Sequence, residues 1–324
     1  MKRNYYILKD GILRRKENTV YFVNKEGKKV LPINKINAIY AYGNLSFTSG
    51  VTTSLAKNGV CIHFYDKYGW YVGSFYPKKV LLSGNLIIQQ VRHYLDKELR
   101  LYLAKRFVEG SCRNIIKNVK NYKLLGYSEK MENLLNDLDN RESIFEIMEI
   151  EGKIREFYYQ TFDEIFPEGW KMGKREKRPP SNKTNCLISF GNSLLYSTII
   201  SEIYNTQLNG TISYLHEPGE RRFSLALDIA DIFKPVIVDR IIFKLINKGM
   251  IDDSYFRKEL GGILLNEKGK RLFIEEYERK MTTTIMHRGL GRKVSYQRLI
   301  RLELYKLIKH LVGLKKYKPF VSRW

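Results

Sequence analysis

A single carboxylate interrupts the apolar face of the helix expected over residues 142–166. The apolar stripe runs through Ile147, Ile150 and Ile154, and Glu151 falls within it. A carboxylate on such a face is costly unless it is paired, protonated or bound to a metal ion. Glu151 is therefore a candidate metal ligand, and an ion pair with Arg155 is the ordinary alternative.

A second group of carboxylates follows one face of an apolar segment further along the chain. Asp228 and Asp231 are three residues apart, and Asp239 lies near the same line. Like charges at this spacing repel unless a cation neutralises them. A divalent metal ion would do so, and Lys234 and Arg240 are the alternative cations.

The third candidate is a histidine in a loop. The chain has five histidines, and His216 lies in segment 214–219, where Pro218 and Gly219 indicate a loop before the start of a helix. A lone histidine commonly has no special role, so His216 gains weight only together with the carboxylates.

Together, Glu151, His216 and one of the two aspartates, Asp228 or Asp231, would form an open metal site with nitrogen and oxygen ligands. Oxygen donors suit Mg²⁺ and Mn²⁺, and the imidazole favours Mn²⁺. Three protein ligands leave positions for water and for a phosphate oxygen. Such a metal ion can polarise phosphorus, activate a hydroxyl group and stabilise the leaving oxygen, so these residues predict phosphodiester chemistry.

The charge balance indicates a polyanionic partner. The 324 residues include 57 Lys and Arg against 34 Asp and Glu, a formal net charge of +23. A field of that sign attracts nucleic acid or an acidic membrane surface, and a generally basic surface is the alternative. Because no apolar run resembles a signal peptide or a membrane span, we expect nucleic acid and no membrane.

The cysteines exclude two classes of site. Cys61, Cys112 and Cys186 are odd in number and widely spaced, which argues against a disulfide framework or a structural zinc site. This pattern fits the reducing cytoplasm.

Two basic runs fit contact with DNA phosphates. One covers residues 174–178, and the other, 287–293, is a Gly-spaced loop with Arg288, Arg292 and Lys293. Glycines there would let the backbone approach phosphate. A solvated surface is the alternative for each run, and the second lacks the pattern of a nucleotide-binding P-loop.

The fold class expected from the sequence is α+β, with a small β-rich domain followed by a larger all-α domain. Residues 1–85 contain only 4 of the 34 Asp and Glu, so clustered carboxylates belong to the second part. Residues 79–84 are the expected linker, and segment 252–265 is compatible with a small hairpin. Strands are expected over 5–8, 19–23, 38–42, 60–65 and 70–75, a short helix over 49–57, and later helices over 85–107, 112–122, 128–138, 142–166, 182–209, 223–247, 269–281 and 296–312. The early strands are typical of a small sandwich or barrel-like sheet.

Several segments, in order, resemble the CRISPR-associated integrase family that inserts new spacers during adaptation. The resemblance extends over essentially the whole chain. The segments are Ile150-Glu151-Gly152 followed by Tyr158 and Tyr159; Arg178-Pro179-Pro180 with Asn182, Asn185 and 189–196; Leu215-His216, Arg222, 224–228 and 231–235; and the tail 317–320.

The resemblance implies an assembly and a substrate. Residues 1–80 would form the β-rich domain that joins two copies into a homodimer, and residues 81–324 the α-helical catalytic domain. Two dimers would flank a dimer of a small ferredoxin-like CRISPR adaptation protein, which makes a heterohexamer. The substrates would be double-stranded DNA, namely the spacer precursor and the CRISPR repeat.

The resemblance also implies roles for particular residues. Glu151, His216 and Asp231 would bind Mn²⁺ or Mg²⁺, and Asp228 would be a further acidic catalytic residue. Lys234 and Arg222 would contact nucleic acid. Relatives often carry Glu at the position of Asp231, and the shorter side chain is expected to shift the metal slightly while preserving the chemistry.

The implied reaction is attack of a 3′-hydroxyl on a phosphodiester at a repeat boundary. Water in place of the hydroxyl would give endonuclease activity. Two other readings use the same sequence: a metal-dependent repair nuclease without integration, and a non-catalytic nucleic-acid-binding scaffold.

Overall fold

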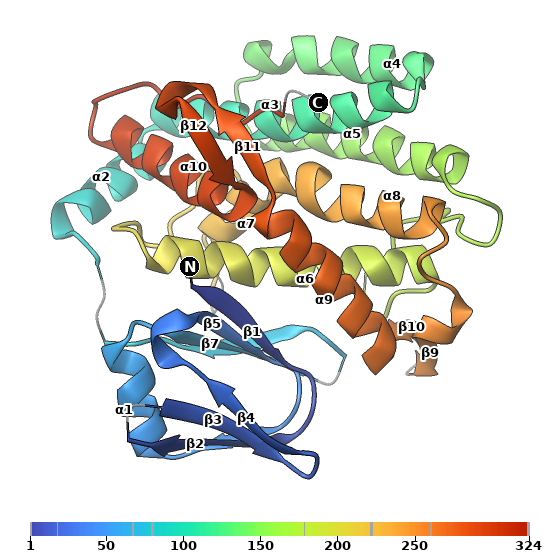
Figure 1. Cartoon of the computed structure of the whole chain (residues 1–324). Coiled ribbons are helices and arrows are strands. Elements are labelled where there is room, and N and C mark those ends of the chain that lie inside the picture. Colours follow the sequence, from blue (N-terminus) through green and yellow to red (C-terminus); the bar gives the residue numbers. More distant parts are fainter. Residues whose placement is uncertain are drawn as a thin grey trace. The chain divides into compact units, whose positions relative to one another are not determined.

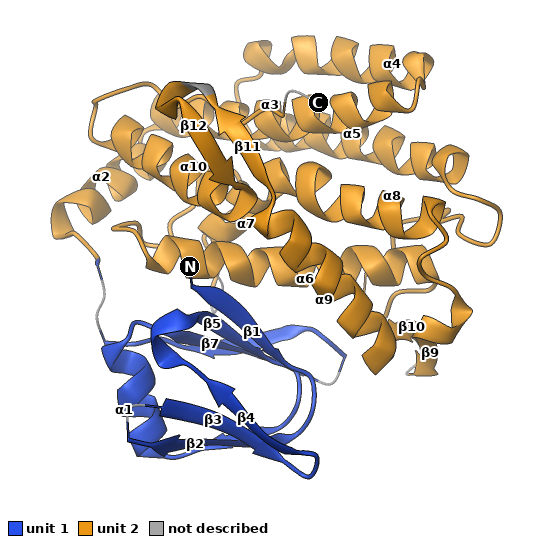
Figure 2. Ribbon diagram, in the orientation of Figure 1, with its two compact units in different colours: residues 1–81 blue, residues 82–324 orange. Residues whose placement is uncertain are grey.

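The computed structural model describes residues 2–17, 19–66, 68–78, 81–177, 179–220, 223–259 and 261–322. The chain forms two compact units, unit 1, residues 1–81, and unit 2, residues 82–324 (Figure 2).

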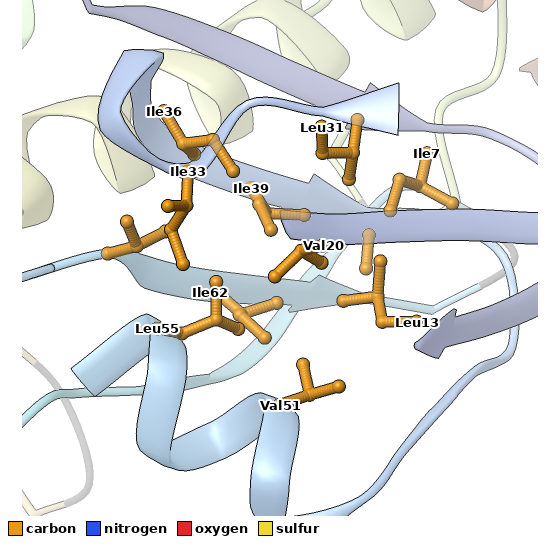
Figure 3. Packing of buried hydrophobic residues seen from close by; sticks show 12 residues of the cluster. Ile7, Leu13, Val20, Leu31, Ile33, Ile36, Ile39, Val51, Leu55 and Ile62 are labelled. Atoms are coloured by element: carbon orange, nitrogen blue, oxygen red, sulfur yellow. The ribbon is translucent and has the colours of Figure 1, made fainter. Parts of the chain in front are cut away.

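Unit 1 consists of two four-stranded sheets and one helix (Figure 1). One sheet has the strand order β1-β5-β7-β8 and the other β4-β3-β2-β6. The elements are β1 (Arg3–Ile7), β2 (Gly11–Lys16), β3 (Thr19–Asn24), β4 (Gly27–Leu31), β5 (Ile36–Ala41), β6 (Leu45–Phe47), α1 (Ser49–Lys57), β7 (Cys61–Tyr65) and β8 (Tyr71–Phe75). One apolar core joins the sheets: Ile39 and Ile62 meet Leu13 and Val20, and α1 adds Leu55 (Figure 3).

The strands β2, β4 and β6 of unit 1 were not predicted from the sequence, because their pattern of apolar residues is weak. In β2 and β4, Leu13 and Leu31 are the buried side chains, and the neighbouring residues are mostly exposed and basic. Backbone pairing with β3 holds both strands. Helix α1 has the expected bounds, and Gly59 just beyond it adopts a φ of +66°.

Unit 2 is mainly helical, and the α+β class is confirmed. Its helices are α2 (Gly84–Leu95), α3 (Lys97–Asn121), α4 (Leu125–Asn136), α5 (Ile144–Ile165), α6 (Lys183–Tyr204), α7 (Ser224–Phe233), α8 (Arg240–Asn247), α9 (Glu267–Thr282) and α10 (Tyr296–Leu311). A π-helical turn, Pro235–Asp239, joins α7 to α8. The helical unit also contains two hairpins, β9 (Phe256–Glu259) with β10 (Gly262–Leu265), and β11 (Thr284–His287) with β12 (Arg292–Ser295).

The break between α2 and α3 differs from the expected one. It falls at Asp96, whose side chain accepts a hydrogen bond of 3.0 Å from the backbone N–H of Leu99. The sequence suggested a break near Gly110, but α3 continues through it. A Cβ at Gly110 would lie 2.5 Å from Cβ of Pro319, so this glycine serves the close approach of the C-terminal tail.

Helix α6 qualifies the expectation that nothing resembles a membrane span. Among the described residues it alone is long and apolar enough to cross a membrane, judged by length and composition. Of its most apolar window, 78% is buried inside the protein, as in the core helix of a globular unit.

Candidate active site

Three elements of unit 2 carry the expected site residues. Helix α5 carries Glu151, the loop 214–219 carries His216, and α7 carries Asp228 and Asp231. Helix α3 packs against both α5 and α7. Helix α5 begins at a capping box formed by Ser143 and Glu146, and this fixed starting point determines which residues lie on each face of the helix.

Asp228 organises the histidine loop. Its fully buried carboxylate accepts hydrogen bonds from the backbone N–H groups of Tyr214 (2.8 Å), Leu215 (3.2 Å) and His216 (3.0 Å). The same carboxylate lies 2.8 Å from Nδ1 of His216. Since a carboxylate accepts, Nδ1 carries the proton and Nε2 is the nitrogen left for a ligand.

The His216 imidazole has a shifted pKa. Burial would lower this pKa, but the hydrogen bond to Asp228 and the charge of Asp231 outweigh burial and raise it. Nε2 lies 3.9 Å from Oδ2 of Asp231. The imidazole thus lies between the two aspartates, hydrogen-bonded through Nδ1 to Asp228, with Nε2 on the side of Asp231.

Helices α2 and α3 hold the same loop from outside. Nε of Arg100 donates to the carbonyl of Tyr214 at 3.0 Å, and its Nη2 lies 2.5 Å from the Glu217 carboxylate. The hydroxyl of Tyr94 donates to Glu217 at 2.8 Å. The position of His216 is therefore fixed from both sides.

Asp231 and Glu151 share a cation. Nε of Arg155 donates to Glu151 at 2.6 Å, and its Nη2 lies 3.3 Å from Oδ1 of Asp231. Nζ of Lys234 lies 2.6 Å from the same oxygen. Burial would raise the pKa of Asp231, but Lys234, Arg155 and His216 together lower it well below its usual range.

Two carboxylates and an imidazole nitrogen suit a divalent metal ion in their chemistry. Within the described ranges, however, no three His, Cys, Asp or Glu side chains gather closely enough to hold an ion, and Arg155 and Lys234 pair with the carboxylates. Both ion pairs considered as alternatives in the sequence are thus present. Glu151 and Asp231 nevertheless both contact the guanidinium group of Arg155. Nε2 of His216 lies 3.9 Å from the Asp231 carboxylate.

Asp239 does not join this group. Its buried carboxylate accepts a hydrogen bond of 3.0 Å from the hydroxyl of Tyr158. Burial raises the pKa of Asp239 to about 6, although Tyr158, Arg155 and Lys234 oppose the shift. Asp239 is the last residue of the π-helical turn, beyond the end of the helix α7 that carries the other two aspartates.

The expected nucleic-acid contacts occupy different places. Lys234 lies at the site, whereas Arg292 and Lys293 are exposed on β12. The expected basic loop is instead a hairpin in which Arg292 pairs with His287. Arg288 begins its turn, but its side chain lies outside the described part, as does the whole of Arg222.

The basic run 174–178 is partly structural. Arg175 donates to Oδ1 of Asn185 and to Oγ of Ser189, both at 3.0 Å, and so ties the run to α6. Burial of Lys177 and the positive charges of Arg175 and Lys234 lower the pKa of its ammonium group. Lys177 therefore lies near the cations of the site. Arg178 lies outside the described residues.

Two residues that were not identified from the sequence form hydrogen bonds with the segments that carry the site. Asn114 and Asn118 of α3 are buried and contact the site helices. Two amides four residues apart on an otherwise apolar helix face were the available signal. Their partners lie 40 or more residues away on other elements, so the sequence alone gave no role.

Comparison with protein families gives one match over most of the chain. The model described as CRISPR associated protein Cas1 matches residues 5–279. A protein of Methanobrevibacter ruminantium named CRISPR-associated protein Cas1 1 is 56% identical, with 100% of this chain and 99% of the relative covered. The CRISPR-associated endonuclease Cas1 of Methanothermobacter thermautotrophicus is 53% identical, with 100% and 96% covered.

Solved structures share the fold. A Cas1 protein from Thermotoga maritima has a TM-score of 0.90 and 37% identity, covering 99% of this chain and 100% of that one. A casposase bound to its integration product has a TM-score of 0.85 at 20% identity, covering 100% and 94%. A Cas6-RT-Cas1–Cas2 complex has a TM-score of 0.85 at 16% identity, covering 100% of this chain and 36% of the longer one. The family match and the full-length relatives show that this chain belongs to the Cas1 family, the integrases and endonucleases of CRISPR adaptation.

Proposed function

We propose that this chain is a divalent-metal-dependent DNA endonuclease and strand transferase that inserts short duplexes at a CRISPR repeat. The observation that carries the proposal is that Arg155 contacts both Glu151 and Asp231, while Nε2 of His216 lies 3.9 Å from the Asp231 carboxylate. A relative is named an endonuclease, and a structural neighbour is a casposase bound to an integration product, which fits cutting and joining.

The ligands would be Glu151, His216 and Asp231, and the ion Mn²⁺ or Mg²⁺. When bound, such an ion supplies charge stabilisation and an activated oxygen nucleophile. Asp228 keeps the proton on Nδ1 of His216 and thereby presents Nε2. Arg155, which holds both carboxylates, must release at least one of them as the ion binds.

Lys234 would bind the phosphate of the DNA. Its Nζ lies 2.6 Å from Asp231 and the side chain is 20% exposed, so it remains beside the site when the carboxylate turns to another cation. An ammonium group there attracts a phosphodiester and neutralises charge on it. Arg222, Arg288, Arg292 and Lys293 are proposed as further DNA contacts.

The proposed assembly follows the family resemblance. Residues 1–80 would form the homodimer interface, residues 81–324 the catalytic domain, and a small ferredoxin-like adaptation protein would complete a heterohexamer in the cytoplasm. A structural neighbour belongs to a Cas1–Cas2 complex, which supports a partner of this kind.

Strand transfer into a supercoiled plasmid tests the function. We expect the chain, with its purified small partner and Mn²⁺ or Mg²⁺, to join a labelled duplex to repeat-containing plasmid. A duplex with 3′-dideoxy ends should give no joined product, since the attacking hydroxyl is absent. Metal-dependent cleavage without joining would favour a repair nuclease, and no metal-dependent cleavage or joining would favour a non-catalytic scaffold.

Neutralising the β11–β12 hairpin should weaken DNA binding through phosphate contacts. For Arg292→Gln combined with Lys293→Gln, the slope of log K against log salt should fall by about 1 per lost phosphate contact. The measurement is fluorescence anisotropy with a short duplex over a series of salt concentrations.

The matched control removes the same charges from the other hairpin. Arg257 and Lys258 are exposed on β9, and Arg257 forms an exposed pair with Glu259 (2.9 Å). Arg257→Gln with Lys258→Gln should leave the slope unchanged. Equal slopes for the two double variants would remove the hairpin β11–β12 from the DNA path.

A further inference from the structure

Helix α3 presents two buried asparagines, one turn apart, to the helices that carry the carboxylates. Asn114 is fully buried and Asn118 is 2% exposed. Residues four apart share a helix face, and α3 packs against both α5 and α7. Buried amides need hydrogen-bond partners, so their partners show which segments they hold together.

Asn114 holds the residue that follows Asp231. Its Nδ2 donates to the carbonyls of Ile232 (3.0 Å) and Phe320 (3.1 Å), and its Oδ1 accepts from the backbone N–H of Ser322 (2.7 Å). One side chain thus fastens α7 and the C-terminal tail to α3.

Asn118 joins the two site helices. Its Nδ2 donates to the hydroxyl of Tyr158 (3.0 Å) and to the carbonyl of Pro235 (2.8 Å), and Oδ1 accepts from Nε of Arg240 (2.9 Å). Tyr158 lies seven residues, about two turns, after Glu151 on α5. Asn118 therefore connects the helix of Glu151 to the end of the helix of Asp231.

The π-helical turn makes the second connection possible. The backbone N–H of Asp239 donates to the carbonyl of Lys234 at 3.1 Å, five residues back. In a regular α-helix this N–H would bind the carbonyl of Pro235. The π-helical turn leaves that carbonyl to Asn118, and such turns often occur at functional sites.

We propose that Asn114 and Asn118 are positioning residues that set the separation of Glu151 and Asp231, and through it the affinity for a divalent metal ion. The inference rests on the metal role proposed above. Metal sites tolerate misplacement of a ligand by only about 0.5 Å. Loss of a group that hydrogen-bonds a metal ligand directly typically costs about 10- to 100-fold in metal affinity. Asn114 and Asn118 act one step further out, through Tyr158 and the backbone of Ile232 and Pro235, so we expect the lower end of that range.

A matched pair of tyrosines tests the connection between α5 and α3. Tyr158→Phe removes the hydroxyl that Asn118 contacts, and Tyr277→Phe removes an equally buried hydroxyl that donates to Thr198 (2.9 Å), between α9 and α6. We expect the Kd for Mn²⁺ to rise about 10-fold for Tyr158→Phe and to stay unchanged for Tyr277→Phe. The readout is the electron paramagnetic resonance signal of free Mn²⁺, measured without DNA.

Asn114→Ala and Asn118→Ala should also weaken Mn²⁺ binding. The double variant Tyr158→Phe with Asn118→Ala should raise the Kd by less than the product of the two single effects, because both changes break the Asn118–Tyr158 hydrogen bond, although Tyr158→Phe also removes the donor to Asp239. If an asparagine variant fails to fold, the Mn²⁺ affinity of Tyr158→Phe tests the inference in its place. Unchanged Mn²⁺ affinity in Tyr158→Phe, or equal loss in Tyr277→Phe, would overturn the inference. A wild-type protein that binds no Mn²⁺ would instead remove the proposed metal site.

Discussion

Alanine at Glu151, His216 or Asp231 is expected to abolish DNA cleavage and joining while duplex binding persists. Each change removes a proposed ligand from a site with only three. A bound metal ion contributes several kcal/mol to the transition state, so a loss of about 4 kcal/mol corresponds to a rate about 1000-fold lower. The measurement is the rate of strand transfer with Mn²⁺, alongside duplex binding by anisotropy.

Glu149→Ala is the matched control for Glu151→Ala. Both glutamates lie on α5 and both pair with a basic residue four positions later, Glu149 with Lys153 at 3.0 Å and Glu151 with Arg155. Glu149 is exposed, so its pair contributes little. We expect normal activity for Glu149→Ala. Near-normal joining by any of the three ligand variants would show that the ligand assignment is wrong.

Asp228→Asn should be the second most damaging change, although Asp228 is not a proposed ligand. An asparagine can turn its NH₂ group toward Nδ1 of His216, which then becomes the acceptor and places the proton on Nε2. A protonated Nε2 cannot bind a metal ion. Loss of such an outer-shell carboxylate costs about 10- to 100-fold in metal affinity, and wrong-tautomer substitution in a serine protease costs about 10⁴ in kcat.

The measurements are Mn²⁺ affinity and the ¹⁵N chemical shifts of the His216 ring, which report the tautomer. Asp163→Asn is the control, because Asp163 also accepts hydrogen bonds from backbone N–H groups, those of Met172 and Gly173, and no histidine in the described part of the chain is a hydrogen-bond partner of its carboxylate. An unchanged tautomer together with unchanged Mn²⁺ affinity in Asp228→Asn would refute the assigned role.

Asp228 shows how much of a residue's role can be inferred from its spacing along a helix. Asp228 and Asp231 share one face of α7, as the three-residue spacing predicts. Their spacing does not distinguish them as metal ligands, and only the resemblance to the family favoured Asp231. The structure separates them, because the loop 214–219 folds its backbone N–H groups around Asp228 and leaves Asp231 beside Arg155.

The fold shows a similar division. Helices with strong apolar periodicity, such as α1 and α5, have nearly the expected bounds. Strand β2 was missed because it is held by neighbouring strands while most of its side chains are exposed. Separate helices were expected over 85–107 and 112–122, but α3 continues through Gly110, because the sequence near that residue does not show that a tail about 200 residues later packs against it.

By itself, the sequence determined the kinds of donor available, the strong positive charge and the order of motifs that place the chain in its family. Glu151, His216 and an aspartate could be grouped as a metal set because two carboxylates and an imidazole suit one kind of ion, and the resemblance to the family selected Asp231. Only the tertiary structure decided how they are held: Arg155 spans both carboxylates, and Asp228 fixes His216. The physical reason is that residue chemistry is local, whereas hydrogen bonds between distant segments exist only after the helices have packed.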